Sequence, residues 1–418
     1  MSLTTYQEAI KRIQERGRSQ TLKSERVPLL DSVGRVLAES IFSFENLPAK
    51  DNSAMDGFVV QAELTRLASI EHPCVLKVFD TIAAGDNFSS EKIEDGGAYG
   101  IMTGAVIPDG AYDAVIRIED VEIFRESGDT FIHIRAPLEK GKNIRPQGSD
   151  FKKDIEILKK GHRLGHEDIM PLAALGINTV LAFKKVKVGI ISTGKEIVPF
   201  STKNLEPAQV RNSSAPFLKS YFASLGCEVV FSEQNEDHPE KFGEKFKSLL
   251  ADECDVLLTT GGVSMGNWDY VTDELQNLGV KLNFYKVAIR PGKPLLFGVH
   301  KETGAAVFGL PGNPVSTAIG ASFFVQPYLR ALHKEEAREG ILLPLANSMK
   351  KPQGLRGFYK ARIETENGVS GVRILDGQGS YMLHSLLEAN SWAVLSEDFE
   401  FLENGNFVEV FPWEGRCL

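Results

Sequence analysis

The sequence predicts a multidomain protein of α/β and β type, centred on a three-layer α/β domain with a mostly parallel sheet. From Lys185 to about Ala331, apolar runs of strand length alternate with segments of helical spacing. That alternation is typical of a sheet covered by helices on both faces. Short strands bounded by Gly, Asp and Pro fill residues 58–137 and recur after Ala331, which indicates β-rich domains. A chain of 418 residues also exceeds one ordinary domain.

The order of these patterns indicates where the chain divides into domains. Helical spacing occurs on both sides of the first β-rich region, so these helical pieces could belong to one elongated domain interrupted by an insertion. The region after the α/β domain has the strand lengths of a small β-barrel or sandwich. The predicted domains are 1–45 with 138–180 (elongated, helical, discontinuous), 46–137 (inserted, β-rich), 181–332 (α/β) and 333–418 (C-terminal β-barrel).

Two local features stand out in the first part of the chain. Helices are predicted from Thr4 to Arg16, with Gly17 as the stop, and from Asp31 to Ala38. After them comes a long polar loop, Asn46–Gly57, that contains two aspartates. Long loops of this kind are usually functional.

Composition and charge exclude several classes of protein. A net charge of −9 and a pI near 5.6 argue against a nucleic-acid or membrane partner. The cysteines Cys74, Cys227, Cys254 and Cys417 lie far apart without metal-binding spacing, so reduced thiols are expected. Residues 1–20 have no signal-peptide core, and no apolar run is long enough to span a membrane. We therefore expect a cytoplasmic protein.

The clearest candidate for a ligand-binding loop begins at Gly261 and Gly262 and continues to Ser264. It follows an apolar strand, Asp255–Thr259, and precedes a segment of helical spacing, Tyr270–Leu278. Glycines at such a position let phosphate groups approach the backbone and its free N–H groups. An ordinary glycine turn is the alternative.

Two further loops favour a pocket over a simple turn. Arg290–Pro294 and Gly309–Ser316 follow within one βαβ span. In the second loop Pro311 precedes Asn313-Pro314, which is a strong helix-start signal. Ligands of open α/β sheets bind at the carboxyl ends of the strands, where these loops fall.

Charged residues gather near the same strand ends. The acids Glu196, Asp237 and Asp269 suit Mg²⁺ beside a phosphate, although the two aspartates also fit as helix N-caps. Three cations stand within eight positions, in or beside a turn stiffened by prolines: Lys286, Arg290 and Lys293. Such a turn could hold a tetrahedral oxyanion or a phosphate. A P-loop is not expected after Thr193, because Ile190 replaces the required glycine.

Six motifs, in order, resemble those of the molybdopterin molybdenumtransferases, the MoeA family, and are similar to the C-terminal part of gephyrin. They are Asp51–Gly57, Ile101–Ala105, Ser192–Glu196, Thr260–Gly266, Arg290–Pro294 and Gly309–Ser316. The resemblance implies that adenylylated molybdopterin and molybdate react, with Mg²⁺, to give molybdenum cofactor and AMP. It also implies a homodimer of elongated protomers with four domains: an interrupted helical domain, an inserted β-rich domain, a molybdopterin-binding α/β domain and a C-terminal β-barrel.

The same resemblance implies roles for individual residues. Mg²⁺ would be held by Asp237 and Asp269, with Glu196 at the adenylate. The phosphate side of the pterin would meet Gly261, Gly262 and Ser264. Molybdate would meet Arg290, Lys293 and Ser316, with Lys286 nearby and the loop prolines Pro311 and Pro314 alongside. The partner's β-rich domain would bring Asp56, Thr103 and Asp150.

Two other functions stay open at this point: a molybdopterin adenylyltransferase, and a gephyrin-like scaffold that only binds partners. The transferase function favoured by the resemblance implies the upstream pterin adenylyltransferase and apo-molybdoenzymes as protein partners. In the last domain Lys360 aligns with a family arginine, and either Ser380 or Ser385 with a family serine.

Overall fold

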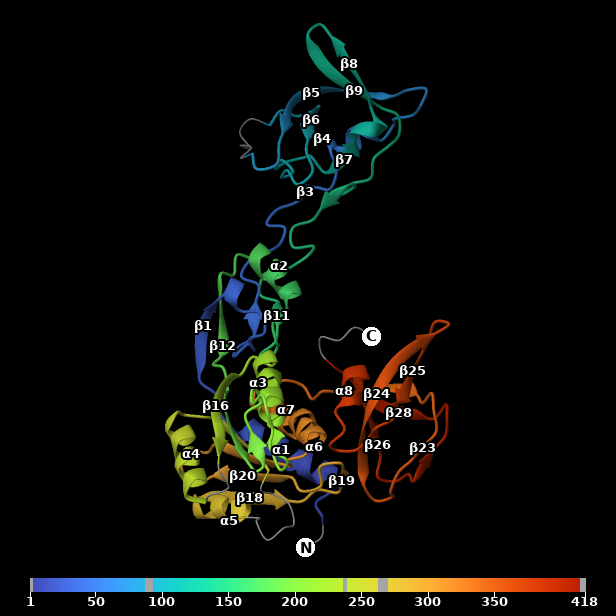
Figure 1. Ribbon diagram of the computed structural model, residues 1–418. Helices are drawn as coiled ribbons and strands as arrows, with labels where there is room; N and C mark the ends of the chain where they lie inside the picture. The colour runs from blue at the N-terminus through green and yellow to red at the C-terminus, as the bar shows by residue number, and fades with distance from the viewer. Residues whose placement is uncertain (1–2, 87–92, 236–238, 262–269, 414–418) are drawn as a thin grey trace. The chain divides into compact units, whose positions relative to one another are not determined.

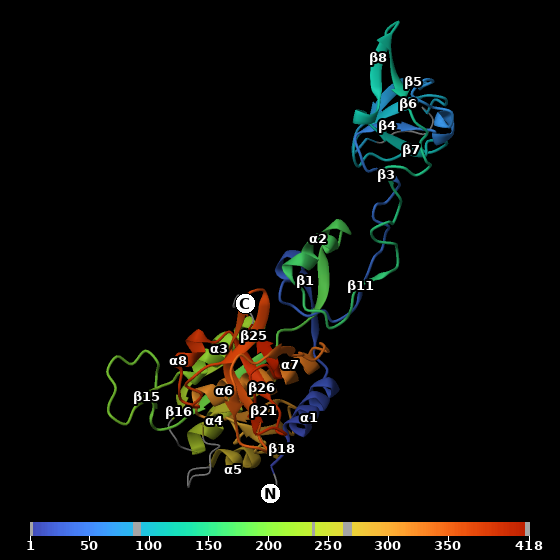
Figure 2. The same ribbon diagram turned by 90° about the vertical axis from the view of Figure 1, so that its right-hand side faces the viewer.

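The computed structural model describes residues 3–86, 93–235, 239–261 and 270–413. Contacts divide the chain into two compact units. The smaller unit holds residues 40–159 and 170–178, and the larger unit holds residues 1–39, 160–169 and 179–418. Figures 1 and 2 show the ribbon from two sides. Within the described residues, no helix has the length and apolarity needed to cross a membrane.

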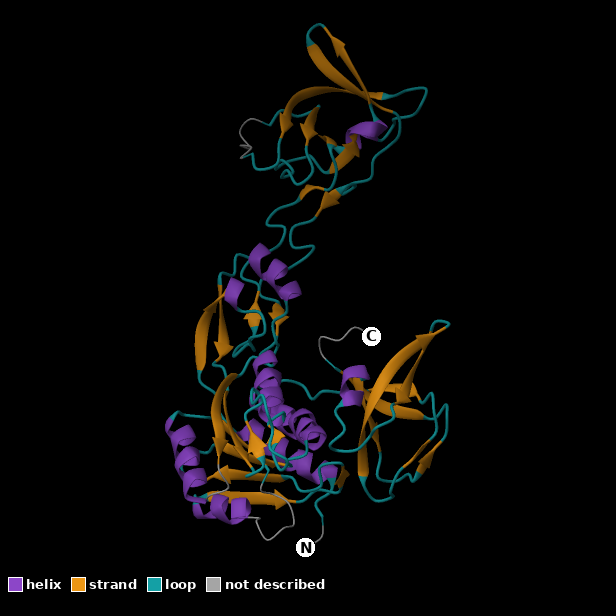
Figure 3. Cartoon of the chain, viewed as in Figure 1, coloured by secondary structure: helices purple, strands orange, loops and turns teal. Residues whose placement is uncertain are grey.

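The smaller unit is built on a six-stranded sheet, and Figure 3 shows that strands and loops dominate this part of the chain. The strand order is β7-β4-β6-β5-β9-β8, antiparallel except between β5 and β6. Apolar residues such as Phe58, Ile116 and Ile132 form its core. The predicted β-rich region is confirmed. Its strands are β4 (Gly57–Val60), β5 (Cys74–Ile82), β6 (Ala98–Ile101), β7 (Ala114–Arg117), β8 (Glu122–Glu126) and β9 (Asp129–Ile134).

Short ladders hold the polar loop of the smaller unit. β3 (Asn52–Ser53) pairs with β10 (Ile144–Arg145), and β2 (Ile41–Phe42) pairs with β11 (Glu156–Leu158). The Asp51 carboxylate also accepts a hydrogen bond from the Gln147 N–H at 2.7 Å. The loop therefore has a fixed backbone.

The larger unit contains the predicted α/β sheet. Its order is β16-β13-β17-β21-β20-β18, and the first four strands are parallel while β20 and β18 are antiparallel. The predicted alternation of strands and helices is confirmed, because parallel neighbours need a helical crossover between them. The strands are β13 (Lys187–Thr193), β16 (Glu228–Asn235), β17 (Val256–Thr260), β18 (Val280–Tyr285), β20 (Leu296–His300) and β21 (Ala306–Leu310).

Helices cover both faces of this sheet because successive side chains of a strand point to opposite sides. Val256 and Leu258 pack with one set of helices and Leu257 with the other. Figure 1 shows α4 and α5 on one side of the sheet. That side carries α4 (Pro239–Ala251) and α5 (Tyr270–Asn277), and the other carries α1 (Tyr6–Ser19), α3 (Ser214–Ser224), α6 (Pro314–Gly320) and α7 (Gln326–Leu332).

The first helix is longer than the sequence predicts. Thr5 caps α1 by accepting a hydrogen bond from the Glu8 N–H at 3.2 Å, as expected. The predicted stop at Gly17 is wrong, because the helix continues to Ser19. A Cβ on Gly17 would lie 2.8 Å from that of Ala331, so this glycine permits close packing of α1 on α7.

The helix predicted from Asp31 to Ala38 is absent. A 3₁₀ turn, η1 (Leu29–Asp31), is followed by Gly34 at φ +80° and by isolated β-bridges of Val36 and Leu37. Leu37 bridges to Ala182, next to the ladder of β1 (Ser24–Pro28) with β12 (Thr179–Phe183). Pairing across the chain therefore overrides local helical spacing. Of the remaining helices, α2 spans His166–Ala174 and α8 spans His384–Glu388.

The C-terminal region forms a second sheet of the larger unit, in the order β19-β24-β26-β28-β22, with β25 on β24. Strands β22 and β25 also approach each other, since Leu345 after β22 bridges to Val372 of β25. Phe358, Trp392 and Phe411 pack from this sheet onto the helices of the α/β domain. The strands are β19 (Ile289–Arg290), β22 (Ile341–Pro344), β24 (Arg356–Glu366), β25 (Val369–Ile374), β26 (Ser391–Leu395) and β28 (Phe407–Pro412), and β23 (Met349–Lys350) pairs with β27 (Phe401–Leu402).

Candidate active site

The carboxyl ends of three parallel strands meet at Gly261. This residue follows β17 with φ +89°, and a Cβ there would lie 2.7 Å from the carbonyl oxygen of Thr193 at the end of β13. A Cβ on Gly312, beyond β21, would lie 3.5 Å from the Cα of Gly261. Only glycine fits at position 261, because any side chain would collide with backbone.

The N–H of Gly261 is not free, contrary to expectation for a phosphate-binding loop. It donates a hydrogen bond to the carbonyl of Leu310 at 3.1 Å. This bond extends the pairing of β17 with β21 by one residue. What Gly261 offers a ligand is therefore close approach to the backbone, without a donor of its own.

Buried hydroxyl groups connect the same strand ends. The Thr193 Oγ1 donates to the carbonyl of Thr260 at 3.2 Å, and the Thr260 Oγ1 donates to the Ser192 Oγ at 3.2 Å. All three side chains are buried. The floor of the site is thus fixed by side chains as well as by the sheet.

A cavity of about 970 Å³ opens above this floor. Its wall includes the exposed carboxylate of Glu196, whose Oε1 would lie 2.9 Å from a Cβ on Gly194. The loop that carries β14 (Ile197–Val198) and β15 (Val210–Arg211) forms another side and stands out in Figure 2. Sequence-predicted residues in the wall are Glu196, Gly261, Pro311 and Pro314, beside Ser192, Thr193, Gly194, Pro294, Gly312 and Asn313.

The predicted cation loop adjoins the cavity through Pro294. Arg290 lies in β19, which pairs with β24 of the C-terminal sheet, and Lys293 is exposed three residues later. Between them Gly292 has φ +101°, and a Cβ there would lie 3.8 Å from the buried Ser316 of α6. The structure therefore brings this loop beside the first turn of α6.

Lys286 lies further from the loop tip. Its φ is +70°, and its Nζ lies 4.6 Å from the centroid of the Tyr285 ring, a cation–π contact. The backbone is held there because the Lys286 N–H donates to the carbonyl of Leu295 at 2.9 Å.

The three candidates of the smaller unit are all exposed. The Asp56 Oδ1 accepts a hydrogen bond from the backbone N–H of Thr103 at 2.7 Å, so these two residues form one local group. The N–H of Asp150 donates to the carbonyl of Leu47 at 3.0 Å. Four other predicted residues lie outside the described residues: Gly262, Ser264, Asp237 and Asp269.

Sequence reasoning missed the contribution of the C-terminal region to the cavity. Tyr381 and Leu383 line it, although they follow the α/β domain at a distance in sequence. Lys360, which aligns with a family arginine, is fully buried and donates to the carbonyls of Gly377 and Met382 at 2.6 and 2.8 Å. No periodicity or motif in the sequence marks this arrangement.

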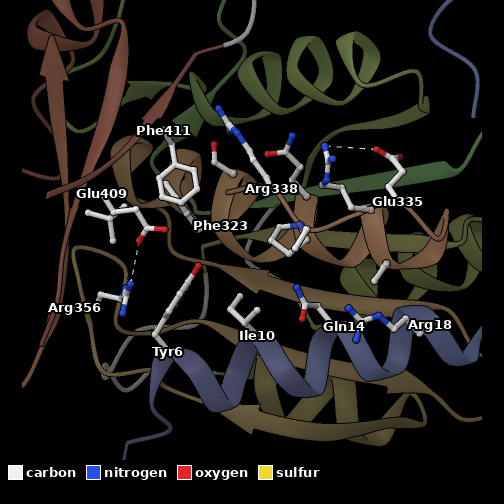
Figure 4. A pocket seen from close by; sticks show the side chains of 17 residues that line it. Tyr6, Ile10, Gln14, Arg18, Phe323, Glu335, Arg338, Arg356, Glu409 and Phe411 are labelled. Carbon is white, nitrogen blue, oxygen red and sulfur yellow. Dashed lines mark hydrogen bonds and ion pairs between the residues drawn. The ribbon is translucent and has the colours of Figure 1, made fainter. Parts of the chain in front are cut away.

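A second, smaller cavity of about 140 Å³ contains no predicted site residue. Figure 4 shows Tyr6 of α1 facing the ion pair of Arg356 with Glu409. The Arg356 guanidinium lies 4.9 Å from the centroid of the Tyr6 ring, and burial raises the pKa of Tyr6. Arg356 is already paired, so this cavity is better understood as part of the packing between α1 and the C-terminal sheet.

Comparisons with known proteins find similarity along most of the chain. Family models match in the order "MoeA N-terminal region (domain I and II)" at residues 4–176, "Probable molybdopterin binding domain" at 189–331 and "MoeA C-terminal region (domain IV)" at 343–413. A molybdopterin molybdenumtransferase of Synechococcus elongatus is 41% identical over 93% of this chain and 94% of its own length. One of Bacillus subtilis is 34% identical, over 93% and 89%.

A solved structure is also similar. The crystal structure of a molybdopterin biosynthesis moeA protein from Pyrococcus horikoshii OT3 aligns with a TM-score of 0.84 and 31% identity, over 99% of this chain and 100% of that one. The likeness extends over both units and every region matched by the family models. The chain therefore belongs to the molybdopterin molybdenumtransferase (MoeA) family.

Proposed function

We propose that this chain is a transferase of molybdenum cofactor biosynthesis that inserts molybdate into adenylylated molybdopterin and releases AMP and molybdenum cofactor. The observation that carries the proposal is the cavity of about 970 Å³ at the carboxyl edge of the sheet. At Gly261 a ligand can come close to the backbone of the cavity floor. The loop of Arg290 and Lys293 adjoins the cavity wall. An anionic, ring-containing substrate and an oxyanion can meet there.

The cations of the loop would receive molybdate. Arg290 offers a planar fork of donors and Lys293 a point charge, and together they would hold a tetrahedral dianion. Lys286 would add positive charge nearby, and Ser316 a hydroxyl from α6. Donors fixed before the reaction stabilise charge without reorganising during it.

The phosphate side of the substrate would lie along Gly261, Gly262 and Ser264, between Pro311 and Pro314. Glu196 would support the adenylate, since its carboxylate already lies in the cavity wall. This assignment rests on close backbone approach at Gly261 and not on its N–H, which is engaged with Leu310.

Mg²⁺ would be held by Asp237 and Asp269, whose oxygens are the ligands that this ion prefers. When bound, it would neutralise phosphate oxygens of the anhydride. Glu196 is the predicted acid in the described part of the cavity wall, and its exposure leaves its carboxylate open to a ligand. Among the residues that the structure describes, no group of three or more His, Cys, Asp or Glu side chains is arranged to hold a metal ion.

We further propose a homodimer in which the partner contributes Asp56, Thr103 and Asp150. In this reading the chain has the four domains given above, with a closed barrel at the C-terminus, which the Leu345–Val372 bridge supports. Free thiols at Cys74, Cys227 and Cys254 support a reducing, cytoplasmic compartment. The upstream pterin adenylyltransferase and apo-molybdoenzymes would be protein partners.

The decisive experiment measures AMP released from adenylylated molybdopterin. We expect release to require both Mg²⁺ and molybdate, and Asp269→Ala to abolish it while leaving the circular dichroism spectrum unchanged. If the protein instead made adenylylated pterin from molybdopterin and ATP without molybdate, it would be an adenylyltransferase. Tight binding of partner proteins without any turnover would indicate a scaffold.

The shared site can be tested by mixing two inactive variants. Asp56→Asn disables the smaller unit and Lys293→Ala the larger unit. If sites form between subunits, mixed dimers regain one intact site, and a 1:1 mixture should recover about a quarter of the wild-type activity after subunit exchange. No recovery, with exchange verified by a labelled subunit, would mean that each chain builds its own site.

A further inference from the structure

The loop that brings Tyr381 to the cavity is held by a lysine inside the protein. Lys360 of β24 is fully buried, and its Nζ donates to the carbonyls of Gly377 and Met382 at 2.6 and 2.8 Å. These carbonyls stand on either side of Tyr381 in sequence. One ammonium group therefore closes the loop 377–382 at both ends.

Additional bonds tie the same loop to β24 and to α8. Gln378 accepts from the Lys360 N–H at 3.0 Å and donates to the Lys360 carbonyl at 2.8 Å. The Ser385 Oγ donates to the carbonyl of Gly377 at 3.0 Å. Burying an ammonium group is costly unless its donors are satisfied, so the observed arrangement favours one loop conformation.

The tip of the loop is fixed on the other side by the α/β domain. The Ser380 carbonyl accepts a hydrogen bond from the N–H of Val315 at 3.1 Å. Val315 directly follows Pro314, which lines the cavity. The loop therefore spans from β24 to the wall of the proposed site, and its next residue, Tyr381, lies at the rim.

Tyr381 keeps 73% of its surface exposed although it lines the cavity. An aromatic ring on a fixed loop loses little freedom when it stacks on a flat ligand. Leu383, also in the wall, adds apolar surface beside it. The cavity wall thus combines a flat aromatic ring and apolar surface with a polar floor at Thr193 and Gly261.

We propose that Tyr381 stacks on the planar nitrogen heterocycle of the bound ligand, and that Lys360 is the positioning residue that holds this platform at the cavity. The chemical class is a fused heteroaromatic ring, which adenine and pterin share. The identity of the ring rests on the proposed function, whereas the platform itself does not.

Binding measurements on the full chain distinguish the two rings. The probes are AMP, which carries adenine, ribose 5-phosphate, which lacks any ring system of this class, and pterin-6-carboxylate. We expect Tyr381→Ala to weaken binding of AMP or of the pterin about tenfold, Tyr381→Phe to bind as the wild type does, and ribose 5-phosphate to be unaffected. The probe that loses affinity identifies the stacked ring.

The matched control is Phe407→Ala. Phe407 is 67% exposed in the same C-terminal region and is not part of the cavity wall, so its removal should leave every affinity unchanged. Equal affinities of wild type and Tyr381→Ala for both rings would overturn the proposal, as would a wild type that binds neither ring.

A double-mutant cycle tests the positioning role. Lys360→Met should weaken ring binding by a similar factor, but should add nothing in the Tyr381→Ala background and should spare ribose 5-phosphate. Additive losses would mean that Lys360 does not act through Tyr381. If AMP release from adenylylated molybdopterin fails in the wild type, the proposed function fails. If turnover persists while ring affinities do not change, only the stacking inference fails.

Discussion

His333 predicts a pH dependence of stability that can be worked out from its surroundings. It lies at the end of α7 and is 6% exposed. The centroid of its ring lies 6.0 Å from that of the Phe183 ring. Burial, then the positive charge of Arg163 and of Arg35, lowers the pKa of His333 from 6.5 to about 4. Glu335 lies 3.5 Å from its Nδ1.

The Glu335 carboxylate does little to reverse this shift because two arginines share it. It is 3.6 Å from Arg330 and accepts a hydrogen bond from Arg163 at 2.7 Å. Since the pKa of His333 is lower in the folded protein, the unfolded chain binds the extra proton below pH 6.5. The stabilisation is therefore complete above pH 6.5 and is lost as the pH falls towards 4, by about 3 kcal/mol in all.

The assay is equilibrium urea unfolding of the wild type and of His333→Phe at about pH 7.5, 6.5, 5.5 and 4.5. These pH values cover most of the range between the folded and unfolded pKa values of His333. Phenylalanine keeps the ring packing against Phe183 but cannot titrate. The free energy of unfolding of the wild type should fall relative to the variant by roughly 2 kcal/mol between pH 6.5 and 4.5. His166→Gln, at a side chain that is 95% exposed, is the control. Parallel curves for wild type and His333→Phe would refute the reasoning.

Three further outcomes follow from the site and the core. Gly261→Ala should abolish AMP release and lower the free energy of unfolding by about 2 kcal/mol or more, because φ at position 261 is positive and the new Cβ would meet Thr193. The control is Gly354→Ala, also at positive φ but with open space around it. This control should lose only the stability that backbone strain costs and should keep its turnover. Arg290→Lys keeps the charge but removes the fork, so we expect the KM for molybdate to rise about tenfold in the same assay. Burial raises the pKa of Cys227 to about 12, so its reaction with a disulfide reagent at about pH 8 should be on the order of a thousandfold slower in the native protein than in urea; equal rates would contradict its burial.

The α/β core can be predicted from sequence because its signals are local. Apolar runs such as Val256–Thr260 have the length and composition of strands, and in a parallel sheet their carboxyl ends must share one edge. That rule alone predicts that Gly261, Glu196 and Pro311 lie near one another, although they are far apart in sequence. In the folded chain all three line one cavity.

Features that depend on distant contacts cannot be predicted in this way. The segment from Asp31 to Ala38 has helical spacing, but Leu37 bridges to Ala182 instead. Gly17 has the position of a helix stop and instead permits close packing on Ala331. The Tyr381 loop joins the cavity because β24 and α6 hold it from two sides. The spacing of residues in the sequence does not predict either contact.

Several candidate residues that the structure describes are held in place by contacts within their own units before any ligand binds. In the smaller unit Asp56 and Thr103 are joined by a hydrogen bond of 2.7 Å. In the larger unit Gly261 lies against Thr193 at the strand ends, and Lys360 closes the Tyr381 loop. Groups fixed in advance lose little freedom on binding, which leaves more of the binding energy for the reaction.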